Sequence, residues 1–175
     1  MTNDSNTSRP AEELTALIER LADKQAELRA AVQAKLETMR RCDVEGMMTA
    51  SRREAVLTAE AAALDQRRQE VVSRLCAALA LPKGTNARRV TLRTLIPKLE
   101  LAAAKRLAKA AERLRAEMLK LAEANRVVDL VCREMMVHFK ALFTAMVQSE
   151  SDPSTYSRGG EVDPAAGARV LDAVG

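Results

Sequence analysis

Apolar residues recur every three or four positions over three long stretches of the chain, and this spacing is typical of amphipathic α-helices. The stretches cover about residues 11–41, 44–80 and 95–147. The first apolar stripe is Leu14, Leu17, Ile18, Leu21, Leu28, Val32, Leu36 and Met39. The second is Val44, Met47, Met48, Leu57, Ala61, Leu64, Val72, Leu75 and Leu79. Few β-branched or aromatic residues alternate at a period of two, so no strands are expected. The pattern predicts an all-α fold, an antiparallel three-helix bundle or coiled coil with long helices.

The first break between the predicted helices is short and contains an acidic residue. Asp43 can cap a new helix by accepting backbone N–H bonds, and Gly46 lowers the helix propensity nearby. These residues favour a tight turn between two antiparallel helices. One kinked helix over residues 11–80 is the alternative.

The second break is a loop that combines proline and glycine. Pro82 and Gly84 lie in residues 81–86, and together they end a helix and turn the chain. Thr94 is then expected to cap the third helix. Pro97 falls within the first turn of that helix, where no intrahelical N–H bond is lost.

The two ends of the chain are polar. Residues 1–9 are rich in Asn, Ser, Thr and Asp and are expected to be disordered, while Pro10 suits the first turn of a helix. Ser, Gly and Pro predominate from residue 149 onward, which predicts a disordered, flexible C-terminal tail. The expected organisation is therefore a disordered N-terminus (1–9), a helical bundle domain (10–148) and a flexible tail (149–175).

The third predicted helix carries more apolar residues in its second half than one face can hold. One stripe follows steps of three or four from Leu99 to Met146 and includes Phe139. Beyond Arg126, further apolar residues fall off that stripe: Val127, Leu130, Val131, Met136, Val137, Phe143 and Val147. A helix with apolar side chains around so much of its circumference has to bury them against neighbouring helices or a partner. The third helix would be roughly 80 Å long against roughly 45–55 Å for the others, so its apolar end is expected to overhang.

Composition and charge narrow the classes of function. The net charge is +4, but the 28 basic and 24 acidic residues are interspersed, which argues against nucleic acid as a partner. The polar N-terminus and the lack of an uninterrupted apolar stretch of roughly 18–20 residues predict neither secretion nor membrane insertion. The cysteines are far apart in sequence and are interpreted as reduced, mostly buried thiols of a cytoplasmic protein: Cys42, Cys76 and Cys132.

Residues with catalytic potential are scattered. No glycine-rich phosphate-binding motif is present, and His138 is the only histidine. Three cysteines and one histidine without ligand spacing predict no metal site. We therefore expect no catalytic residue, no cofactor and no enzymatic activity. A basic cluster is interpreted as a solvated loop, because no aromatic residue is interleaved for base stacking: Arg88, Arg89, Arg93 and Lys98.

Several segments together resemble the FlgN-type flagellar export chaperones, which serve the hook–filament junction proteins. Two helices flank a short Asp-containing break, and a Leu-Pro-Lys-Gly loop leads into a Thr-Leu-x-x-Leu-Ile start. A hydrophobic helix then opens with Leu121-Ala-Glu-Ala-Asn125-Arg, and the tail contains Tyr156-Ser-Arg-Gly-Gly160. The resemblance covers most of residues 11–175.

The resemblance implies a cytoplasmic, non-enzymatic chaperone of flagellar type III secretion. Such a protein holds the terminal helical region of an unassembled hook-associated protein and delivers it to the cytoplasmic domain of the export gate. In that family a tail tyrosine is associated with gate docking, and Tyr156 is the only tyrosine here.

Excess apolar residues of the third helix, together with Phe139 of the stripe, are the expected cargo-binding site: Val131, Met136, Val137, Phe139, Phe143 and Val147. An amphipathic cargo helix can lie along such a face. The main alternative is a structural coiled-coil homodimer that buries the same surface. A basic helical nucleic-acid binder is the weakest alternative.

Overall fold

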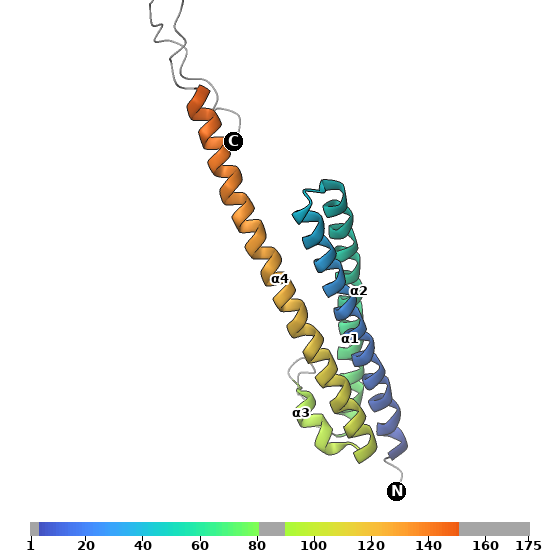
Figure 1. The fold of residues 1–175 in the computed structure, drawn as a ribbon. Helices are drawn as coiled ribbons and strands as arrows, with labels where there is room; N and C mark the ends of the chain where they lie inside the picture. Colours follow the sequence, from blue (N-terminus) through green and yellow to red (C-terminus); the bar gives the residue numbers. More distant parts are fainter. Residues whose placement is uncertain (1–3, 81–89, 151–175) are drawn as a thin grey trace, which may run out of the picture. The chain divides into compact units, whose positions relative to one another are not determined.

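The computed structural model describes residues 4–80 and 90–150, and the secondary structure of this part is entirely helical (Figure 1). Its elements are α1 (Asp4–Arg40), α2 (Val44–Ala78), α3 (Leu92–Leu95), the 3₁₀ turn η1 (Ile96–Lys98) and α4 (Leu101–Glu150). The chain divides into a first unit, Met1–Val128, and a second unit, Asp129–Gly175. The predicted all-α fold with long helices that pack together is confirmed.

In the first unit, α1 and α2 lie side by side as an antiparallel hairpin (Figure 1). The apolar stripe expected on the first helix is its buried face, with Leu14 and Val32 at 0% and 1% exposure and Leu36 half-buried. A separate turn joins the two helices, so the alternative of one kinked helix over residues 11–80 is wrong.

Asp43 and Gly46 build the turn at the tip of the hairpin. Asp43 is the N-cap of α2, as the sequence predicts, and its Oδ1 accepts a hydrogen bond of 2.8 Å from the backbone N–H of Gly46. The backbone N–H of Asp43 donates to the carbonyl of Thr38 at 3.0 Å. A Cβ at position 46 would collide with the capping carboxylate and lie 2.7 Å from Cγ2 of Thr38. Only glycine therefore fits at position 46 without displacing the cap.

The main core of the first unit joins four elements. Its buried residues come from α1, α2, α3 and the beginning of α4, and they include Leu14, Ile18, Val72, Leu75, Leu95 and Leu107. A smaller cluster lies further along the hairpin, where Leu28, Ala31, Leu57 and Ala61 pack together and Leu121 of α4 covers them. Each large aliphatic side chain buried in this way contributes about 1.5–3 kcal/mol.

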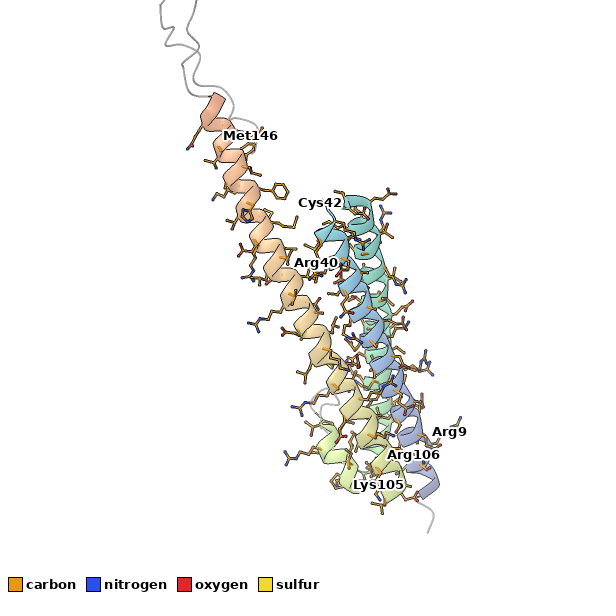
Figure 2. The ribbon with its side chains drawn as sticks, viewed as in Figure 1. Arg9, Arg40, Cys42, Lys105, Arg106 and Met146 are labelled. Carbon is orange, nitrogen blue, oxygen red and sulfur yellow. The ribbon has the colours of Figure 1, made fainter. Side chains whose placement is uncertain are left out.

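Ion pairs also join α1 to the first half of α4. The nitrogen–oxygen distances are 2.6, 3.4 and 3.8 Å for Asp23–Arg113, Arg29–Glu117 and Glu12–Arg106. Figure 2 shows Arg106 and Arg9 toward one end of the first unit, while Cys42 lies at its other end, at the tip of the hairpin. The two exposed pairs, Asp23–Arg113 and Glu12–Arg106, contribute about 0–1 kcal/mol each, whereas Arg29–Glu117 is partly buried. Apolar burial therefore supplies most of the stability of the helix packing.

Both ends of the predicted bundle extend further than expected. The first helix begins at Asp4, so residues 4–9, expected to be disordered, are helical, and Pro10 lies inside α1. The proline removes one intrahelical N–H bond, while Thr7, Ser8 and Pro10 are half-buried, so this end of the helix is partly shielded from water. At the other end α4 continues to Glu150, and residues 151–175 of the predicted tail lie outside the described residues.

The predicted start of the third long helix is also wrong. A short α3 begins at Leu92, so Pro97 falls beyond the first turn and its missing N–H ends the regular helix. Leu99 is extended, with φ −97° and ψ 159°, and α4 begins only at Leu101. Thr94 is not a cap, because its hydroxyl donates 2.7 Å to the carbonyl of Thr91.

We predict that Gly46→Ala destabilises the protein by roughly 1–2 kcal/mol, because the loss of the cap and the steric conflict outweigh the higher helix propensity of alanine. The free energy of unfolding from urea denaturation checks this. Thr49→Ala, at an exposed position of the same helix, is the matched control and should stay within about 0.5 kcal/mol of the unmodified chain. An equal or higher stability for Gly46→Ala would contradict the proposed role of the turn.

Candidate functional site

The second unit exposes a dense set of large apolar side chains. Its described part is residues 129–150, the end of α4, and these residues form one helical segment. Val131 and Met135 are half-buried. The others are between 40% and 68% exposed: Leu130, Met136, Val137, Phe139, Leu142, Phe143, Met146 and Val147. A single helix has no interior, so these side chains need a second surface to leave water.

Most of these side chains share one face. At about 100° per residue, an arc of about 160° around the helix holds nearly all of them. We call this face the apolar arc: Val131, Met135, Met136, Phe139, Leu142, Phe143, Met146 and Val147. Five of the six residues expected from the sequence to bind cargo lie on it. Val137 lies outside the arc, on the same side of the helix as Leu130.

Three residues of the apolar arc were expected to belong to an intramolecular stripe instead. Met135 is half-buried, whereas Leu142 and Met146 are 62% and 66% exposed. Their spacing of three to four residues from Phe139 and Phe143 indicates a shared face. Periodicity alone cannot say whether such a face is buried within the chain or exposed.

Phe139 and Phe143 are the only phenylalanines of the chain, and both lie on the apolar arc. They are 60% and 66% exposed, whereas the core of the first unit is built from aliphatic side chains. Aromatic side chains bury large areas and dominate the energetics of interfaces. The chain therefore exposes both of its phenylalanines on this face.

Charged and polar side chains flank the apolar arc, while Leu130 and Val137 lie on the side opposite to it. Arg133 and Asp129 form an ion pair of 2.6 Å one turn apart, and His138 and Lys140 are exposed. Paired charges at this spacing are typical of a solvated helix face. The apolar arc is therefore bordered by hydrated side chains.

The three cysteines are all free, but they have different surroundings. Cys76 is buried, and this burial raises the pKa of its thiol, which lowers its reactivity. Cys42 and Cys132 are exposed, so the expectation of mostly buried thiols is wrong for these two. A buried thiol such as Cys76 acts as a small apolar side chain in the core.

Tyr156, the expected gate-docking residue, lies outside the described residues. Within residues 4–80 and 90–150, no three His, Cys, Asp or Glu side chains are arranged to hold a metal ion. In the same part of the chain, every helix is too short in apolar length to cross a bilayer.

Comparison with protein families gives one finding that bears on this surface. A family profile described as FlgN protein matches residues 10–164, a range that includes the bundle and the apolar arc. No curated protein and no solved structure matches the chain. Because the family match spans most of the sequence, the chain belongs to the FlgN family, the flagellar export chaperones.

Proposed function

We propose that this protein is a cytoplasmic chaperone that binds terminal helical segments of flagellar hook-associated proteins. It prevents their premature assembly and delivers them to the flagellar type III export gate. Membership of the FlgN family supports a chaperone role in flagellum assembly. The single observation that carries the choice of binding surface is the exposed apolar arc with both phenylalanines.

A client helix can lie along the apolar arc and match its spacing. Phe139 and Phe143 are one turn apart, and Met136 and Val147 continue the same face in the two directions. Burying each of these side chains contributes about 1.5–3 kcal/mol, and association and ordering cost about 4–15 kcal/mol. The cost of association and ordering offsets much of the free energy gained by burial, so binding stays reversible. Reversible binding suits a carrier that has to release its client.

Methionine suits a surface that must fit a client helix without a fixed shape. Met135, Met136 and Met146 lie on the arc. Their unbranched side chains are adaptable and occur often at binding surfaces with several partners. We infer that the methionines adjust to the client while the two phenylalanines provide fixed anchors.

Tyr156 is proposed as the residue that docks the chaperone on the export gate. The support is its position in the Tyr-x-x-x-Gly segment of the tail and its being the only tyrosine of the chain. An aromatic ring with a hydroxyl group can combine apolar contact with a hydrogen bond at an interface.

We predict that Phe143→Ala and Met136→Ala each weaken binding of a hook-associated subunit by about tenfold, because each removes an anchor worth more than about 1 kcal/mol. Both side chains are about two-thirds exposed, 66% and 68%, so the fold should be unchanged by circular dichroism. Isothermal titration with the purified subunit measures the affinity. Leu130→Ala, exposed on the same helix but outside the arc, is the matched control and should bind like the unmodified chain. Unchanged affinity in both arc variants would contradict this binding surface.

The same proteins distinguish the chaperone from the alternative, a structural homodimer. Analytical ultracentrifugation of the free chain and of its mixture with the subunit gives both masses. A dimer that persists on dilution and excludes the subunit would favour the structural alternative, in which the arc is buried between two copies. A mixed complex that Phe143→Ala weakens supports the chaperone.

We predict that Tyr156→Ala leaves the affinity for the subunit unchanged but weakens binding of the loaded chaperone to the cytoplasmic gate domain by about tenfold or more. The measurement is the binding of the preformed chaperone–subunit complex to gate domain immobilised on a surface. Tyr156→Phe keeps the ring and tests the hydroxyl separately. Equal gate binding by Tyr156→Ala would remove this residue from the docking site.

A further inference from the structure

A groove of about 410 Å³ lies in the first unit between α1 and α4. Its floor is apolar, with Val32 and Leu36 from α1 and Ala124 and Val127 from α4. An apolar floor between two helices is the setting in which an additional amphipathic helix binds.

Polar side chains form the rim of this groove, and their charges are ordered along it. The rim residues are Arg29, Gln33, Lys120 and Glu123. Arg29 and Lys120 converge on one carboxylate, that of Glu117, at 3.4 and 2.7 Å. The side chain of Glu117 is 13% exposed, and its hydrogen bond with Lys120 lowers the pKa of the carboxyl group, so it is ionised at neutral pH.

Two cations that share one carboxylate leave an excess positive charge at this end of the groove. The buried Nε of Arg29 and Oε2 of Glu117 face each other at 3.4 Å, which makes this a long ion pair rather than a well-formed hydrogen bond. Glu123 lies one helical turn beyond Lys120 and carries a negative charge on the rim. The order of charges is therefore positive and then negative, about 4.5 Å apart along the axis of α4.

We propose that this groove is a second client-binding site, which takes an amphipathic helix whose apolar stripe is flanked by an acidic residue and, one turn away, a basic residue. This rests on the proposed function, since the client supplies the helix. The acidic residue faces Arg29 and Lys120, the basic residue faces Glu123, and apolar side chains rest on Val32, Leu36, Ala124 and Val127. The charge order selects one direction of the client helix, because a reversed helix places like charges together.

The test uses the full-length chain and fluorescein-labelled synthetic peptides that cover the terminal helical segments of a hook-associated subunit. Lys120→Glu reverses one charge of the rim, and Ala124→Glu places a charge on the apolar floor. Each should weaken peptide binding by about tenfold, as measured by fluorescence anisotropy. Lys109→Glu, an exposed lysine of the same helix outside the groove, is the matched control and should bind within about twofold of the unmodified chain.

A charge exchange gives a second readout that a folding defect cannot reproduce. A peptide whose acidic flanking residue is replaced by lysine should bind Lys120→Glu better than the unmodified chain. The same peptide should bind Ala124→Glu no better than it binds the unmodified chain. A photo-reactive residue at the exposed position 33 should crosslink to the peptide, whereas crosslinks only to a second copy or to residues 151–175 would overturn the proposal.

The proposals for the groove and for the apolar arc can be overturned independently of each other. If Lys120→Glu and Ala124→Glu bind the peptides as the unmodified chain does while Phe143→Ala binds weakly, the groove proposal is overturned and the proposed function stands. If the groove variants bind weakly and Phe143→Ala does not, the groove is supported and the arc is wrong. Failure of every peptide to bind the unmodified chain overturns both.

Discussion

A helix can bury only the face that another element covers, and this constraint organises the whole molecule. In the first unit α1, α2 and the first half of α4 cover one another, and side chains such as Leu75 and Leu107 are withdrawn from water completely. In the second unit the described residues are one helical segment, and most of its large apolar side chains are exposed. The same type of sequence therefore produces a core in one unit and an exposed apolar arc in the other.

The distribution of side-chain types follows this division. The core of the first unit is made of leucine, valine, isoleucine and alanine together with the buried Cys76, and these side chains pack closely spaced helices. The two phenylalanines and several methionines are placed on the arc instead. A chain with so few aromatic residues that exposes both of its phenylalanines has its largest apolar groups where a partner can reach them.

The sequence predicts much of the fold because long helices depend on a period that is visible without a structure. The stripe from Leu14 to Met39 is the buried face of α1, and Asp43 caps α2 as expected. The second stripe is less accurate, since Val44 and Met48 are 67% and 53% exposed and the buried Val71 was not assigned to it. Steps of three and four give several acceptable stripes in an alanine-rich helix, and only the packing of α2 selects among them.

The candidate site was predictable in part for the same reason. An excess of apolar residues beyond one stripe identifies Met136 and Phe143, whereas the exposed side chains of Leu142 and Met146 depend on which neighbours are present. The groove between α1 and α4 was not predictable, because it depends on the distance between two helices. Its charge order also joins Arg29 to Lys120, which are far apart in sequence.

The central claim is that the apolar arc is open to water in the free chain and covered by the client in the complex. Hydroxyl-radical footprinting of the full chain reports the oxidation of Met136, Phe139 and Phe143 with and without a hook-associated subunit. The account predicts strong oxidation of all three side chains in the free protein and clear protection when the subunit is added. Weak oxidation in the free protein, or strong oxidation that the bound subunit leaves unchanged, would contradict it.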